Sequence, residues 1–115
     1  MSNIIQEICD WNYIRGNTEF HPVLEGAMLD EELDEFLDAY NNNDKVEMAD
    51  ALADIIFVAV GSLYKLTGCN EEKVEDILLA VTAANNLKPK DKVKGKVVKG
   101  DKFIEPQPLI KEILG

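Results

Sequence analysis

Two helical segments joined by a short polar turn constrain the fold of this chain more than any other feature. The segment 29–40 (LDEELDEFLDAY) repeats apolar residues at intervals of three and four, which is the spacing of an amphipathic helix. The segment 47–60 (EMADALADIIFVAV) is apolar on most sides from Ala49 onward, as is typical of a central, buried helix. Only Asn-Asn-Asn-Asp (41–44) separates them, with Asn43 as the expected N-cap, so the two helices should be antiparallel neighbours.

Both helices carry a line of carboxylates beside their apolar residues. Glu32 and Glu35 lie three positions apart on the first, and Glu47, Asp50 and Asp54 follow at intervals of three and four on the second. Residues at these intervals share one face of a helix. If the two faces meet, they form a pocket of carboxylate oxygens. Mg²⁺ prefers such ligands, and the sequence predicts a magnesium site here, with Mn²⁺ as a possible substitute.

Asp54 carries most of this argument because apolar residues flank it on both sides. Burying an unpaired carboxylate costs several kcal/mol, of the order expected for an isolated buried ion. The first 87 residues contain 18 acidic side chains and four basic ones, Arg15, Lys45, Lys65 and Lys73. Four cations cannot neutralise this many acids, so a bound divalent cation is the more economical partner for Asp54.

Other kinds of metal site do not fit the sequence. A di-iron helical bundle requires Glu-x-x-His on paired helices, whereas the only histidine, His21, lies outside both acidic segments. Neither the spacing of cysteines and histidines for zinc nor the loop of an EF-hand is present. Ligation by oxygen alone therefore leaves magnesium, manganese or calcium.

The rest of the chain extends the helical pattern and predicts an all-α fold. We expect a four-helix bundle with a lysine-rich C-terminal extension, built as one domain with a helical body at 1–87 and the extension at 88–115. A chain of 115 residues buries a modest share of its surface alone, which favours an oligomer. The expected helices cover Asn3–Arg15, Pro22–Tyr40, Asp44–Leu66, Glu71–Leu87 and Leu109–Leu114, with a short hairpin or ordered loop before the last.

Charge is distributed unevenly along the chain. Residues 1–87 have a net charge of −14, whereas residues 88–102 contain seven Lys and two Asp, a net charge of +5. The acidic body argues against nucleic acid as a partner, and the lysine cluster suits a small phosphate ligand. Asn85, Lys88 and Lys99 are therefore the predicted substrate-binding residues, although each also suits an ordinary helix end or loop.

The sequence predicts a cytoplasmic protein with no membrane partner. Cys9 and Cys69 form no disulfide framework and no Cys-x-x-Cys pair, which favours a reducing compartment. The N-terminal segment has no basic region of the kind found in signal peptides. The longest apolar run, Ile55–Val60, is far shorter than the roughly 18 residues of a membrane span.

The acidic segments, EELDEF followed by DALADIIFVAVG, resemble the all-α nucleoside triphosphate pyrophosphohydrolases. This MazG-like superfamily includes phosphoribosyl-ATP pyrophosphohydrolase, and the resemblance covers about residues 24–108. Its Glu-x-x-Glu motif matches Glu32 and Glu35. The later stretch resembles a branch that has Asn-x-x-Lys after the fourth helix and Lys-Gly near an aromatic residue and prolines. The residues matching this branch are Asn85, Lys88, Lys99, Gly100, Phe103 and Pro106.

One position departs from the family's second motif, Glu-x-x-Asp. If Asp54 is the family aspartate, the glutamate falls on Ala51, and the literal motif is Glu47 with Asp50 one turn earlier. We favour Asp54 as the ligand because the aliphatic run follows it directly. Either Glu47 or Asp50 would then supply the missing carboxylate.

The resemblance implies a homodimeric or homotetrameric enzyme that converts a nucleoside triphosphate to the monophosphate and pyrophosphate with Mg²⁺. Glu31 or Glu35 would activate the attacking water. The resemblance also implies a role in removing non-standard or excess deoxynucleotides. Three alternatives stay open: a non-catalytic nucleotide- or metal-binding bundle, a purely structural helical module, and hydrolysis of phosphoribosyl-ATP.

Overall fold

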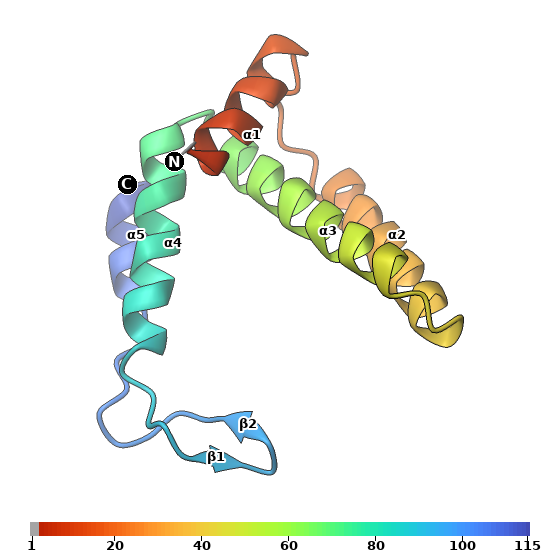
Figure 1. Cartoon of the computed structure of the whole chain (residues 1–115). Helices are drawn as coiled ribbons and strands as arrows, with labels where there is room; N and C mark the ends of the chain where they lie inside the picture. The colour runs from red at the N-terminus through yellow and green to blue at the C-terminus, as the bar shows by residue number, and fades with distance from the viewer. Residues whose placement is uncertain (1–2) are drawn as a thin grey trace. The chain divides into compact units, whose positions relative to one another are not determined.

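The structure, a computed structural model, describes residues 3–115, and its elements are five helices and one small hairpin (Figure 1). It divides into two compact units, Met1–Glu71 and Glu72–Gly115, which are described separately below. None of the helices in the described range has the length and hydropathy required to cross a bilayer.

The first unit consists of three helices, α1 (Ile4–Ile14), α2 (Pro22–Asn41) and α3 (Lys45–Leu66). Helices α2 and α3 lie side by side as an antiparallel pair, and α1 packs on α3 (Figure 1). The short turn between α2 and α3 enforces the antiparallel pairing, as the sequence predicts. This pairing brings the two acidic lines onto facing helices.

The ends of these helices follow local rules, with one correction. Helix α2 begins at Pro22, whose fixed φ and missing N–H suit the first turn. Helix α3 is capped by Asp44, whose Oδ1 accepts a hydrogen bond of 3.1 Å from the backbone N–H of Glu47. The predicted cap, Asn43, is wrong by one residue. Asn43 instead adopts a left-handed backbone (φ +57°) that reverses the chain, a conformation asparagine tolerates better than most residues.

The second unit contains α4 (Glu71–Asn85, with its first residue in the first unit), a hairpin of β1 (Lys92–Val93) and β2 (Lys96–Val97), and α5 (Gln107–Leu114). Helix α4 ends two residues earlier than expected. The hairpin was one of two predicted alternatives, and its two-residue loop explains why it forms. Lys94 and Gly95 both have positive φ, as a type I′ turn requires.

Candidate active site

Three carboxylates converge between α2 and α3. Glu32 and Glu35 from α2 and Asp54 from α3 each contribute one oxygen, and these oxygens lie within 4.8 Å of one another. Glu32 and Asp54 are half-buried, whereas Glu35 is exposed. The helical spacing places both glutamates on one face of α2, and the antiparallel pairing brings Asp54 opposite them. The sequence predicted all three as metal ligands.

The site concentrates negative charge, and two basic side chains of the first unit, Lys65 and Arg15, have other partners. Lys65, a possible partner for Asp54, pairs instead with Glu25 at 2.6 Å. Arg15 lies over the ring of Trp11, 4.4 Å from the ring centroid. Neither side chain therefore neutralises the three carboxylates.

Glu32 shows the electrostatic cost of this arrangement. Desolvation is the largest cause that raises its pKa, followed by hydrogen bonding and repulsion from Glu35 and by the charges of Asp54 and Glu31. Together they raise the pKa of Glu32 from 4.5 to about 7. Its Oε2 is buried and has no hydrogen-bond partner among the described residues. A buried carboxylate oxygen without a partner is what a site for an oxygen-binding cation would provide.

The separation of the oxygens can be compared with the size of hard divalent cations. Metal–oxygen distances of 2.0–2.1 Å for Mg²⁺ place opposite ligands about 4.2 Å apart, and the longer distances of Ca²⁺ allow about 5 Å. The three oxygens lie within 4.8 Å of one another, a separation within the span of Ca²⁺ and somewhat wider than that of Mg²⁺. The chemistry of the all-oxygen donor set suits Mg²⁺ and Mn²⁺ as well as Ca²⁺.

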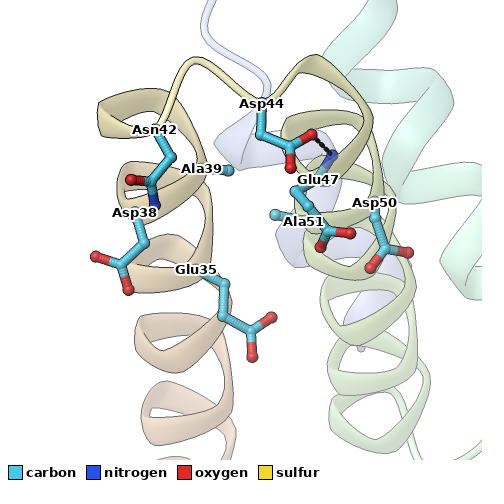
Figure 2. Close-up of a pocket in the computed structure, with 8 residues that line it drawn as sticks. All are labelled: Glu35, Asp38, Ala39, Asn42, Asp44, Glu47, Asp50 and Ala51. Carbon is cyan, nitrogen blue, oxygen red and sulfur yellow. Dashed lines mark hydrogen bonds between the residues drawn. The ribbon is translucent and has the colours of Figure 1, made fainter.

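A wider acidic pocket of about 440 Å³ adjoins the three carboxylates, toward the turn between α2 and α3. In Figure 2 the Glu35 side chain points toward α3, whereas Asp38 points away from it. Both Glu47 and Asp50, the alternatives for the missing family carboxylate, line this pocket together with Glu35. Neither of them belongs to the group of three converging oxygens. The remaining lining residues are Asp38, Ala39, Asn42, Asp44 and Ala51.

Ala51 lies in this pocket and is only 2% exposed. A glutamate at this position would have extended into the acidic space between the helices. Alanine at position 51 supplies no carboxylate, whereas Glu47 and Asp50 lie about one turn or less away along α3.

A comparison with known protein families identifies the family of this chain. A family model described as phosphoribosyl-ATP pyrophosphohydrolase matches residues 17–85, which is more than half of the chain. The chain belongs to the phosphoribosyl-ATP pyrophosphohydrolase family. This family hydrolyses acid anhydrides, releasing pyrophosphate from a nucleotide triphosphate. No curated protein and no solved structure matches the chain.

The part of the chain matched to the phosphoribosyl-ATP pyrophosphohydrolase family contains all of α2 and α3, and so all three converging carboxylates. Glu31, the alternative to Glu35 as general base, also lies on α2. It affects Glu32 electrostatically but is outside the converging group. The resemblance recognised from the acidic motifs is thereby confirmed at the level of the family.

The predicted substrate-binding residues lie in the second unit, at and beyond the end of the family match. Asn85 is the last residue of α4, and its carbonyl accepts a hydrogen bond from the backbone N–H of Lys88. The ammonium groups of Lys88 and Lys99 lie 5.8 and 5.1 Å from the ring centroid of Phe103. Lys99 also pairs with Glu105 at 2.6 Å. The loop thus gathers two cations on one aromatic ring, and one of them already has an anionic partner.

Sequence reasoning missed a buried ion pair in the first unit of this family member. The side chains of Glu25 and Lys65 are 4% and 9% exposed, and Ser62 donates a hydrogen bond of 2.8 Å to the same Glu25 oxygen. Burial raises the pKa of Glu25, but the hydrogen bonds from Lys65 and Ser62 and the charge of Lys65 leave it below its ordinary value. The 40 positions between Glu25 and Lys65 give no local pattern that would reveal the pair.

We expect Glu32 to destabilise the metal-free protein as the pH rises from about 4.5 to about 7. The folded protein binds this proton more tightly than the unfolded chain, because the native pKa is about 7 against 4.5. Ionisation in this interval therefore lowers the free energy of unfolding. Melting temperatures measured against pH in EDTA should fall less steeply for Glu32→Gln than for the wild type. Asp34→Asn, which removes an exposed charge from the same helix, should follow the wild-type curve. Identical curves for wild type and Glu32→Gln would contradict the assignment.

Proposed function

We propose that this member of the family hydrolyses a nucleoside or deoxynucleoside triphosphate to the monophosphate and pyrophosphate with Mg²⁺, which Mn²⁺ can replace. The observation that carries the proposal is the convergence of Glu32, Glu35 and Asp54, with one Glu32 oxygen buried and unpaired among the described residues. An enzyme that binds a metal–triphosphate complex must hold the cation beside the anionic substrate, and carboxylate oxygens meet this need.

Glu32 and Asp54 would hold the cation from facing helices, with Glu35 as a third, exposed ligand. Glu47 or Asp50, which line the adjoining pocket, would bind the cation directly or through a water molecule. When bound, Mg²⁺ neutralises the charge that develops on the leaving pyrophosphate.

The reaction also needs a group to receive the proton of the attacking water. Glu35 would act as general base through the carboxylate oxygen that does not hold the cation. Glu35 is exposed and belongs both to the three carboxylates and to the adjoining pocket, which supports it over Glu31 in this role. The water oxygen forms a bond to the α-phosphorus as its proton passes to the carboxylate. The bond from that phosphorus to the bridging oxygen breaks, and pyrophosphate leaves with the bridging oxygen.

Asn85, Lys88 and Lys99 are proposed to bind the substrate, the two lysines through its phosphates and Asn85 through the sugar, the base or a phosphate. The gathering of Lys88 and Lys99 around Phe103 supports a shared role for these cations. A phosphate would compete with Glu105 for Lys99, since both are anions that pair with the same ammonium group.

A second candidate substrate is phosphoribosyl-ATP, which the description of the matching family favours directly. It contains the same triphosphate and would release the same pyrophosphate. The lysine-rich extension beyond residue 85 lies outside the family match, which is why we rank simple triphosphates first.

We also propose that the chain forms a homodimer or homotetramer in the cytoplasm, completing a four-helix bundle. Apolar side chains on the paired helices support this, because Leu33 and Leu37 on α2 and Leu52 and Ile56 on α3 are 46–60% exposed. Association would remove these side chains from water. A net charge of −10 argues against nucleic acid as an additional partner.

A pyrophosphate-release screen tests the proposed function. Canonical, deoxy and modified triphosphates and phosphoribosyl-ATP are each incubated with the protein and Mg²⁺, and the nucleotide product is identified. We expect equimolar pyrophosphate and monophosphate, and loss of activity in EDTA that Mg²⁺ or Mn²⁺ restores. Exclusive turnover of phosphoribosyl-ATP would favour the second candidate. Nucleotide binding without any product would instead support a non-catalytic bundle and contradict the proposal.

A further inference from the structure

A second pocket in the first unit lies between α1, α2 and α3, beside the carboxylates. It has a volume of about 300 Å³ and shares Glu32 and Asp54 with the proposed cation site. A pocket of this size is large enough to enclose part of a small ligand. Its position means that a ligand held at the carboxylates by its phosphates could place its remaining half here.

The walls of this pocket are mostly apolar and partly aromatic. Trp11 and Phe57 meet edge to face, with ring centroids 5.0 Å apart, and Met28 and Val58 extend the apolar surface. Arg15 covers the Trp11 ring and holds its own guanidinium against the backbone carbonyl of Trp11 at 3.2 Å. Such walls suit a flat, weakly polar group rather than a second phosphate.

Besides the two carboxylates, the polar side chains of Asn12, Asn17 and Lys65 also line this pocket. Asn12 is 4% exposed and lines the pocket. Its Nδ2 donates a hydrogen bond of 2.9 Å to the carbonyl of Ile8, which fixes the orientation of the amide. Within the described part of the chain, its Oδ1 accepts no hydrogen bond. An amide oxygen kept available in this way is an acceptor for a ligand N–H group.

Gly61 on α3 makes space for this amide. A Cβ atom at Gly61 would lie 3.0 Å from Nδ2 of Asn12, closer than side-chain atoms normally approach. Glycine at this helical position therefore allows the Asn12 amide to pack closely against α3. By contrast, Gly26 on α2 has open space around it, and an added Cβ there would meet no neighbouring atom.

We propose that this pocket binds the nucleobase of the substrate, and that Oδ1 of Asn12 accepts a hydrogen bond from an N–H group of the base. This inference rests on the proposed function, since the phosphates of the same molecule would lie at Glu32 and Asp54. The apolar walls would contact the ring, and Asn12 would be the buried amide that meets the edge of the base. Every common nucleobase presents an N–H donor on its pairing edge, so the chemical class is a nucleobase rather than one particular base.

Trp11 provides a direct reporter of binding, because it is the only tryptophan in the chain and it lines this pocket. Nucleoside monophosphates should change its fluorescence in a saturable manner in EDTA, whereas ribose 5-phosphate, which has no base, should not. Asn12→Leu should weaken the binding of monophosphates on the order of tenfold, because the donor of the base loses its buried acceptor. Gly61→Ala should also weaken it by displacing Asn12, whereas the matched control Gly26→Ala should bind as the wild type does.

The outcomes separate this inference from the proposed function. If the wild type hydrolyses triphosphates but ribose 5-phosphate and monophosphates affect Trp11 alike, the nucleobase pocket is wrong and the hydrolysis stands. Unchanged binding in both folded variants, Asn12→Leu and Gly61→Ala, would also overturn it. If monophosphates bind with the expected pattern but no triphosphate is hydrolysed, the pocket stands and the proposed catalysis fails. Melting curves of each variant establish that it is folded before its binding is compared.

Discussion

Replacement of Asp54 by asparagine should nearly abolish pyrophosphate release while making the metal-free protein more stable. The substitution keeps the shape of the side chain but removes the charge that faces Glu32 between α2 and α3. We expect kcat/KM with Mg²⁺ to fall on the order of a thousandfold, equivalent to roughly 4 kcal/mol of transition-state stabilisation. Because repulsion from Asp54 also contributes to the raised pKa of Glu32, the melting temperature in EDTA should rise.

These two opposite changes distinguish a cation site from a structural acidic face. The stabilisation by Mg²⁺ expected in the wild type should be lost in Asp54→Asn, since a ligand that binds the folded state raises its stability only where the site exists. Asp34→Asn removes an exposed carboxylate from α2 and should change neither activity nor the response to Mg²⁺. Wild-type turnover in Asp54→Asn would remove the basis for the proposed mechanism.

Replacement of Lys65 by methionine should lower the free energy of unfolding more than any other substitution proposed here for the first unit. The Lys65 ammonium lies 2.6 Å from Glu25, and both side chains are more than nine-tenths buried. Removing one partner of a buried pair leaves an uncompensated charge, which costs about 3–5 kcal/mol. Urea unfolding at neutral pH measures this loss, and Lys45→Met, which removes an exposed lysine at the start of α3, should change stability by less than about 0.5 kcal/mol.

A double variant tests whether the loss comes from the buried charge itself. In Glu25→Gln/Lys65→Met the charge on Glu25 is also gone, so much of the lost stability should return.

The stability contributed by the Glu25–Lys65 pair should also depend on pH. The pKa of Glu25 is lowered in the folded state, so its contribution is present above the ordinary glutamate value and is lost as the pH falls through the native pKa. A Lys65→Met variant as stable as the wild type would show that the pair contributes little.

The helices and the converging carboxylates were accessible from sequence because they depend on local patterns. Apolar residues at intervals of three and four define α2 and α3 whatever surrounds them, and Pro22 marks the start of α2. The same intervals place Glu32 and Glu35 on one face, and a four-residue turn leaves no choice but an antiparallel partner. The convergence with Asp54 follows from these facts together.

Choices between adjacent or equivalent residues were not accessible in this way. Asn43 and Asp44 are both good capping residues, and only the path of the chain through the turn assigned the cap to Asp44 and the left-handed conformation to Asn43. Similarly, Glu47 and Asp50 both line the pocket beside Ala51. Helical spacing suggested both residues and does not select which of them supplies the additional carboxylate.

The sequence by itself determined the helical class, the antiparallel α2–α3 pair and the carboxylates that face each other across it, because each of these follows from short-range periodicity and turn length. Only the tertiary structure decided that Lys65 neutralises Glu25 rather than Asp54, and that Gly61 gives room to Asn12 in a second pocket beside the carboxylates. The physical reason is that these contacts join residues 40 or more positions apart. Their formation depends on how the helices pack and rotate against each other, which no local pattern encodes.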